Sequence, residues 1–112
     1  MSPQDLKIGS AYYRVTFADP KLTIPEVRPL VFLGLNVFDS DGGGKGPVYT
    51  FQDAQSFYRL GNAVDFKGTA RLSAEGVQTY ALTSAQVGEL ADLSAAAEAL
   101  NDAVERAHWE SR

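Results

Sequence analysis

The segment Leu30-Val-Phe-Leu-Gly-Leu-Asn-Val-Phe38 is the most apolar stretch of this chain. A short apolar run bounded by turn residues is typical of a strand that is covered on both faces. Gly34 interrupts the run, and a glycine inside a strand often marks a bend or a bulge. The sequence therefore predicts a central β-strand here, irregular at Gly34, around which the other elements assemble.

The residues after this segment predict a hairpin followed by a short helix. Residues 39–47 are rich in glycine and indicate a loop, and residues 48–51 form the returning strand. Asp53 is a favoured N-cap for a helix over residues 54–60, and Gly61 stands where helices commonly end. The spacing on that helix predicts three inward side chains, Ala54, Phe57 and Leu60, and three outward ones, Gln55, Tyr58 and Arg59.

Before the apolar segment, residues 12–17 alternate as a half-buried strand does. The face predicted to be buried holds Tyr13, Val15 and Phe17, and the face predicted to point outward holds Tyr12, Arg14 and Thr16. The next segment contains Pro20, Pro25 and Pro29. Because prolines lack the N–H donor and restrict the residue before them, this segment predicts a long, stiff connection.

Residues 64–72 and 77–82 predict a last pair of strands, joined at 74–76. About five strands with helices at the end indicate an α+β protein. Two architectures remain open, a strongly bent antiparallel sheet and an SH3-like small barrel, each with one short helix and a C-terminal amphipathic helix packed on the sheet. The chain of 112 residues is long enough for one domain, 1–112.

The net charge of −4 lies entirely in the last thirty residues. Residues 1–82 contain eight basic and eight acidic residues, whereas residues 83–112 contain six acidic residues and two arginines. Charge asymmetry of this kind constrains partners more than fold. The chain therefore divides into a neutral β-rich body, 1–82, and an acidic helical tail, 83–112.

The tail has the signals of an amphipathic helix. Thr83 and Gln86 have the spacing of a capping box. Apolar residues then recur at spacings of three and four, as in a heptad seam: Leu90, Leu93, Ala97, Leu100, Val104 and Ala107. An unbroken helix to Trp109 would be about 39 Å long, longer than the body, so we expect it to overhang the body or to break at Asp92–Ser94, with Ser94 as a second N-cap.

Two surfaces are candidates to pack against this seam: the body of the same chain, and the same helix of a second copy. The residues on either side of the seam are mostly small and uncharged, whereas coiled-coil dimers usually carry complementary charges there. A wide apolar stripe is typical of a helix docked on its own domain. Docking on the body is the preferred prediction, and the chain is expected to be a monomer or a weak homodimer through the C-terminal helix.

Composition excludes several classes of site. The chain has no cysteine and one histidine, His108, so disulfides, thiolate metal sites and histidine clusters are excluded. The scattered basic residues and a pI near 4.8 argue against nucleic acid and anionic membranes as partners. The apolar runs are far shorter than the roughly 20 residues of a spanning helix, and the N-terminus lacks a secretory pattern. The expected location is cytoplasmic.

The glycine-rich loop resembles two ligand motifs and fits neither. In a phosphate-binding loop Ser or Thr follows the lysine, but Gly46 follows Lys45. In a calcium loop, Gly43 would stand where a side-chain oxygen ligand is needed, and Thr50 where a bidentate Glu is expected. His108 falls in the last helical turn, where a cation suits the helix dipole. We therefore predict no cofactor, no metal and no catalytic residue.

The leading hypothesis is a noncatalytic protein-interaction module, such as a small inhibitor, immunity-type or accessory protein, whose acidic helical face meets a basic surface of another protein. Tyr, Arg and Trp are enriched at the energetic centres of interfaces. The candidate partner-binding residues are Tyr12, Arg14, Tyr58, Arg59, Glu98, Asp102, Glu105 and Trp109. The alternative is a small-molecule-binding protein or small hydrolytic enzyme with a pocket between the sheet and the C-terminal helix.

Overall fold

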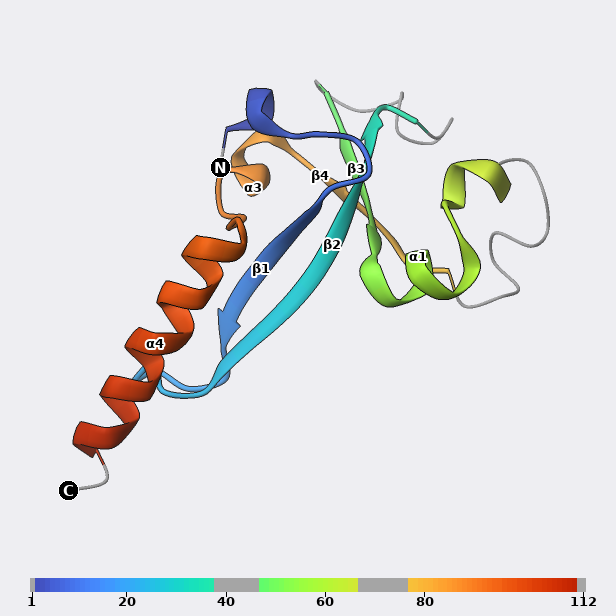
Figure 1. Ribbon diagram of the computed structural model, residues 1–112. Helices are drawn as coiled ribbons and strands as arrows, with labels where there is room; N and C mark the ends of the chain where they lie inside the picture. The colour runs from blue at the N-terminus through green and yellow to red at the C-terminus, as the bar shows by residue number, and fades with distance from the viewer. Residues whose placement is uncertain (1, 38–46, 67–76, 111–112) are drawn as a thin grey trace.

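The computed structural model describes residues 2–37, 47–66 and 77–110, and these form an antiparallel sheet with helices on both faces (Figure 1). The strands follow one another in the order β1-β2-β3-β4. Their bounds are β1 (Ala11–Phe17), β2 (Pro25–Leu35), β3 (Tyr49–Asp53) and β4 (Thr79–Leu82). The helices are α1 (Ala54–Leu60), α3 (Ser84–Val87) and α4 (Leu93–Glu110). The α+β class is confirmed.

The sheet of the described residues is open and has four strands, so neither the SH3-like barrel nor a fifth strand is confirmed. A strand was predicted at 64–72, but its first residues belong to a 3-10 helix, Ala63–Phe66. There the Val64 N–H donates to Oδ1 of Asn62 at 2.9 Å, and the Asp65 N–H donates to the Asn62 carbonyl. These bonds occupy donors that a strand would need. Residues 67–72, the loop 39–46 and the turn 74–76 lie outside the described residues.

The long stiff connection predicted from the prolines is wrong, because β2 already begins at Pro25. Pro25 and Pro29 pair with Phe17 and Tyr13 of β1. The Tyr13 N–H and carbonyl both bond to Ala91 on the far side of β1, so the ladder bonds between β1 and β2 skip this position. The prolines therefore sit where β1 requires no donor, and β3 pairs with β2 only from Leu30 onward. Strands tolerate proline at such an open edge.

Two local predictions are confirmed. The register between β2 and β3 shifts between Phe32 and Gly34, which places the irregularity at the predicted glycine. Gly34 has φ +143°, and a Cβ there would lie 2.7 Å from Cγ1 of Val37. Asp53 caps α1 by accepting the Ser56 N–H, and the helix ends at Gly61 with φ +91°.

The core lies on one face of the sheet, under α3 and the N-terminal segment. Its buried residues come from all four strands and from the start of the tail: Tyr12, Leu30, Phe32, Phe51, Leu82, Val87 and Leu90. On the opposite face, α1 packs on β2 and β3, and α4 packs on β1 and β2. The faces of β1 alternate as predicted, but the face that holds Tyr12 is the core face at that end of the strand.

The tail is interrupted as predicted, but earlier than Asp92–Ser94, because α3 ends at Val87, residues 88–92 follow, and α4 already begins at Leu93. Its capping box is present, since Thr83 Oγ1 accepts the Gln86 N–H and Gln86 Oε1 accepts the Thr83 N–H. After α3 the chain forms a two-bond bridge to β1, in which Ala91 and Tyr13 exchange N–H···O bonds of 2.8 Å. The side chain of Asp92, rather than Ser94, then caps α4 by accepting the Ala95 N–H at 2.8 Å.

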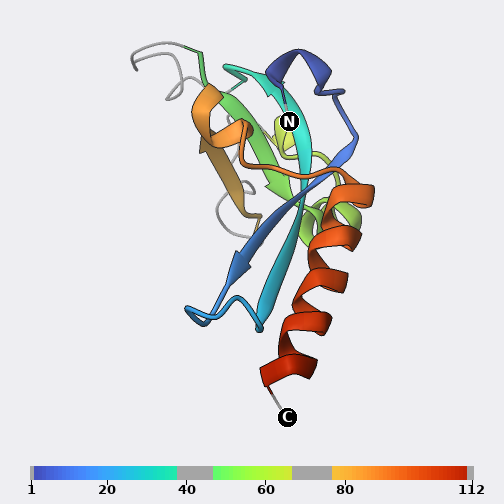
Figure 2. The same cartoon turned by 90° about the vertical axis from the view of Figure 1, so that its left-hand side faces the viewer.

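The molecule is elongated, with principal extents of 55 × 29 × 22 Å and a radius of gyration of 16.0 Å. A compact domain of this length has a radius of gyration of about 13 Å. Figures 1 and 2 show the reason, because the β1–β2 hairpin and α4 extend together away from the other elements. We call this extension, residues 13–29 with α4, the arm.

Candidate interaction surfaces

α4 docks on the arm through small side chains. Ala96 is 2% exposed and Ala103 is 1% exposed, and Ala99 between them is half-buried. Arg106 continues this line of the helix, donating from Nε to the Leu22 carbonyl at 2.7 Å. Its guanidinium lies 5.5 Å from the centre of the Phe17 ring. This docked face combines close alanine packing with one cation–π and hydrogen-bonded anchor.

The seam predicted to dock is wrong, because its large residues face solvent. Leu93 and Val104 are each 67% exposed and Leu100 is 38% exposed. Ala97 is exposed as well. Leu90 is buried, but it lies between α3 and α4 and is not part of α4. The Ala91–Tyr13 bridge sets the rotation with which α4 starts, and that rotation turns the alanines inward. We call Leu93, Ala97, Leu100 and Val104 the apolar stripe.

A second exposed side of α4 carries the negative charge. Glu98, Asp102 and Glu105 are all exposed, as predicted. At 100° per residue they lie on the side of the helix away from the docked alanines. Ser94, Asn101 and His108, which are also exposed, separate them from the apolar stripe. We call these three carboxylates the acidic face.

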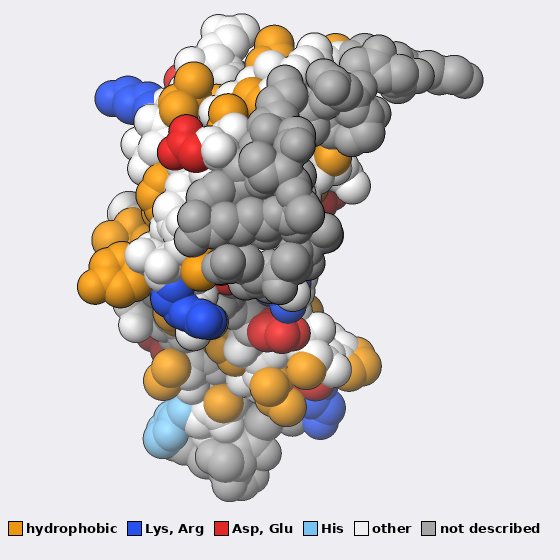
Figure 3. All heavy atoms as spheres, turned by 90° about the vertical axis from the view of Figure 1, so that its right-hand side faces the viewer, with side chains coloured by type: hydrophobic (Ala, Val, Ile, Leu, Met, Phe, Trp, Pro, Cys, Tyr) orange, Lys and Arg blue, Asp and Glu red, His pale blue; other side chains and the backbone are white. Residues whose placement is uncertain are grey.

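The lower end of the molecule, where α4 and the β1–β2 turn lie, carries many exposed hydrophobic side chains (Figure 3). The turn and α4 each expose large apolar residues. Those of the turn are Leu22 and Ile24, and those of α4 are Leu93, Leu100 and Val104. Exposed apolar patches often mark an interaction site, so both elements are candidates for one.

The opposite side of the arm is polar and hollowed. Arg14, Thr16, Glu26 and Arg28 line a hollow of about 130 Å³. Arg14 and Arg28 are directly opposite each other in the β1–β2 register. Arg28 donates from Nη1 to the Tyr80 hydroxyl at 3.3 Å and lies 6.0 Å from the ring centre. Like charges placed opposite each other destabilise a sheet modestly, and the contact with Tyr80 offsets this for Arg28.

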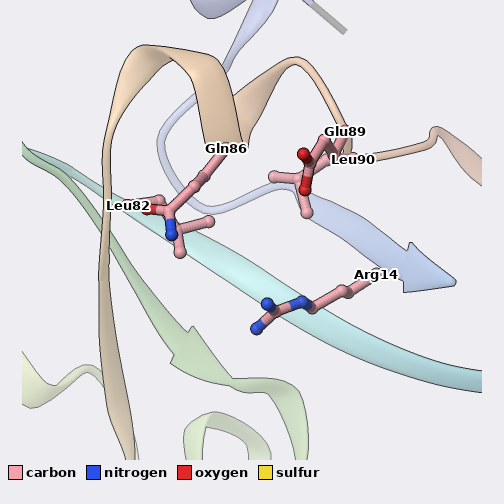
Figure 4. A pocket seen from close by; sticks show the side chains of 5 residues that line it. All are labelled: Arg14, Leu82, Gln86, Glu89 and Leu90. Atoms are coloured by element: carbon pink, nitrogen blue, oxygen red, sulfur yellow. The ribbon is translucent and has the colours of Figure 1, made fainter. Parts of the chain in front are cut away.

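Arg14 also borders a smaller hollow at the edge of the core. Figure 4 shows Gln86 and Glu89 projecting toward the sheet, with Arg14 lying across the strands beside them. The hollow measures about 10 Å³, which is the space of a single water molecule rather than of a ligand. Both hollows therefore lie on the face of β1 away from α4.

The predicted partner-binding residues do not gather in one patch. Tyr12 was predicted to be outward and is instead buried, because its ring packs in the core and its hydroxyl accepts the Lys7 N–H at 2.8 Å. Tyr58, 90% exposed, and Arg59 lie on α1, which packs beside β3 and away from α4 at the β1 edge of the sheet (Figure 1). The side chain of Trp109 lies outside the described residues. Arg14 is exposed on the polar side of the arm, and the acidic residues are exposed on α4.

Sequence reasoning missed the docked face and one buried polar group. The alanines that dock recur at spacings of three and four, just as the larger apolar residues do. The line of larger residues was predicted to be the docking surface because of their size. Gln52 is fully buried in β3 and bonds Ser56 in the first turn of α1 and two groups beyond the end of that helix, at Gly61 and Ala63. No pattern in the sequence indicates that a single glutamine in a strand bridges β3 and α1 in this way.

The turn at the tip of the arm depends on Asp19. Its carboxylate accepts the N–H groups of Thr23 and Ile24 and the Thr23 hydroxyl. The Thr23 side-chain bond, followed by these backbone bonds, lowers the pKa of Asp19 from its ordinary value of 3.8. A carboxylate with a lowered pKa stabilises the turn fully above that ordinary value and loses the effect as the pH falls through the folded-state pKa.

We therefore expect the amide protons of Thr23 and Ile24 to exchange faster with solvent, relative to unstructured amides, once the pH falls below about 3.8. Proton exchange followed by NMR across this range measures the effect. Asp19→Asn is the control, because its amide does not titrate. Protection that stays constant down to pH 2 in the unsubstituted chain would contradict the assignment.

Within the described parts of the chain, no three His, Cys, Asp or Glu residues are grouped so as to hold a metal ion. Among those residues there is also no helix with the length and apolar character to cross a membrane. Comparisons with protein-family models, curated proteins and solved structures gave no match to this chain.

Proposed function

We propose that this protein is a noncatalytic protein-interaction module whose acidic face binds a basic surface of another protein. The observation that carries the proposal is the placement of α4. The three carboxylates of the acidic face point to solvent on an arm that extends from the core, while Arg106 of the same helix is turned to the β1–β2 hairpin. The charged side chains of the acidic face are therefore all negative, whereas the body of the chain is neutral overall.

A face of this kind acts mainly on association kinetics. Exposed single ion pairs contribute only about 0–1 kcal/mol each, so three carboxylates do not by themselves make a tight complex. They raise the rate of encounter with a positive surface and suppress encounters with negative ones. Added salt screens that attraction, with a screening length of about 8 Å at physiological ionic strength. A salt-sensitive association rate is the expected signature.

The alternative of a ligand pocket between the sheet and α4 has less support. The alanines of the docked face lie close against the arm, and the hollows described above are on the other side of β1. The cytoplasmic location stays a prediction.

Removing the charge of the acidic face is expected to slow association with the basic partner about tenfold at low salt. The variant is Glu98→Gln, Asp102→Asn and Glu105→Gln together. The partner is captured from the native host at low salt, identified, purified and then used in surface-immobilised kinetics across a salt series. We expect the variant to lose most of the salt dependence of the association rate.

A matched control removes three exposed carboxylates from the body: Asp5→Asn, Glu26→Gln and Asp65→Asn. It changes the net charge equally but leaves the acidic face intact. If both triple variants slow association to the same extent, net charge rather than α4 governs binding, and the proposal is wrong.

A further inference from the structure

The proposed function uses the acidic face and leaves the apolar stripe unexplained. Isolated exposed leucines are normal on protein surfaces. Here Leu93, Ala97, Leu100 and Val104 follow one line of the helix at spacings of four, three and four, and none is buried. A helix that packs its alanines inward and shows its larger residues to solvent has its better packing surface unused.

We propose that a second copy of this chain covers the apolar stripe, with the two α4 helices packed antiparallel. The first argument is the charge beside the stripe. One side of it is the docked face, formed by Ala96 and Ala103, and the other is formed by Ser94, Asn101 and His108. Two copies meeting along the stripe therefore bring no carboxylate directly against another, despite a net charge of −4 each.

The second argument is size complementarity across a two-fold axis. Placing the axis between Ala97 and Leu100 sets Leu100 of each copy against Ala97 of the other. The same axis sets Leu93 of each copy against Val104 of the other. Large side chains then meet small or branched ones at each layer, which is the arrangement that helix pairs use to interdigitate.

The third argument is shape. The core lies at the N-terminal end of α4, while its C-terminal half is accompanied only by the hairpin of the arm (Figures 1 and 2). In an antiparallel pair, the two cores therefore lie at opposite ends of the helices, whereas a parallel pair would place them side by side at one end. α4 is about 27 Å long, so this interface is at the small end of the range for specific complexes and the dimer is expected to be weak.

The acidic faces take no part in the interface of this dimer. In each copy they lie beyond Ser94, Asn101 and His108, away from the stripe, so both remain exposed. A basic protein bound to the apolar stripe would gain little electrostatic attraction, because the carboxylates of the acidic face point away from the stripe. Self-association is thus expected to be unchanged or strengthened by salt, which is opposite to the salt response of the proposed partner binding.

Sedimentation of the full chain from about 10 µM to about 1 mM tests the dimer. We expect a reversible shift from monomer to dimer, weakened at least about tenfold by Leu100→Glu, as expected when a buried leucine is replaced by a charge. Ile8→Glu, which alters an exposed apolar residue of the body, is the matched control and is expected to leave the shift unchanged. Circular dichroism verifies that both variants are folded. A chain that is monomeric throughout, or equally affected by both substitutions, overturns the proposal.

Disulfide trapping tests the geometry, because the chain has no cysteine of its own. Ala97→Cys lies near the proposed axis and is expected to form a cross-linked dimer under mild oxidation. Leu93→Cys lies about 16 Å along the axis from its counterpart in the antiparallel pair and is expected to remain uncross-linked. Cross-linking through position 93, or its absence at position 97, overturns the antiparallel pairing. Neither result depends on the acidic face, so failure here is distinguishable from failure of the proposed function.

Discussion

Replacing Gln52 by Leu is expected to lower the free energy of unfolding by about 3 kcal/mol. The Gln52 side chain is fully buried and bridges β3 to the end of α1. Its Nε2 donates to the Ser56 hydroxyl at 3.2 Å and to the Gly61 carbonyl at 3.0 Å, and its Oε1 accepts the Ala63 N–H at 2.8 Å. Leucine has similar volume and bonds none of these groups.

The size of the effect follows from what the substitution leaves behind. Ala63 is fully buried, so its N–H would lose its acceptor in a place that water does not reach. An unpaired buried polar group costs about 1–3 kcal/mol, and the Ser56 hydroxyl and the Gly61 carbonyl each lose a donor as well. Chemical denaturation followed by circular dichroism measures the change in unfolding free energy.

Gln55→Leu is the matched control, because Gln55 is exposed on α1 and the substitution is chemically the same. Surface changes of this kind stay within about 0.5 kcal/mol. A Gln52→Leu variant as stable as Gln55→Leu would contradict the role of Gln52 as a clamp between β3 and the end of α1.

Replacing Ala103 by Leu is expected to destabilise the protein by about 1–3 kcal/mol, while Ala97→Leu is expected to change stability by less than about 0.5 kcal/mol. Ala103 is 1% exposed at the contact between α4 and the arm, so three additional carbon atoms there push the helix away from β1. Ala97 lies on the exposed apolar stripe of the same helix. The two variants gain the same atoms and differ only in the side of α4 that they alter.

Thermal unfolding, together with hydrogen exchange along α4, measures both effects. Samples are kept at low micromolar concentration so that self-association does not contribute. The heptad seam seen in the sequence predicts the reverse order, because it places position 97 at the docked surface and position 103 beside it. A greater loss of stability from Ala97→Leu than from Ala103→Leu would therefore support docking through the heptad seam and contradict docking through the alanines.

The local elements were largely predictable because their signals are contained within a few residues. Asp53 and Gly61 set the bounds of α1, Thr83 and Gln86 start α3, and Gly34 marks the bulge. In each case a side chain or a backbone conformation acts on groups three or four positions away or on the residue itself. Such interactions do not depend on what the rest of the chain does.

The candidate surfaces were predictable only in part. The outward acidic face and the exposed Tyr58 were recognised from helical spacing alone. Tyr12 was assigned to the wrong environment, although its face of β1 was correct, because the cover supplied by α3 and by the N-terminal segment is remote in sequence. The prolines of β2 were misjudged for a related reason, since proline is excluded from a strand only where a neighbouring strand requires its donor.

The C-terminal helix separates these two kinds of information most clearly. Its position, its break near Asp92 and its outward charge follow from residue order, because caps and periodicity are local. Its rotation does not, because alanines and leucines recur on it with the same period. The pairing of Ala91 with Tyr13, which lies far away in sequence, fixes that rotation and presses the alanines onto the arm. Burial is a property of two surfaces in contact, so the face of α4 left for a partner emerges only when the chain is folded.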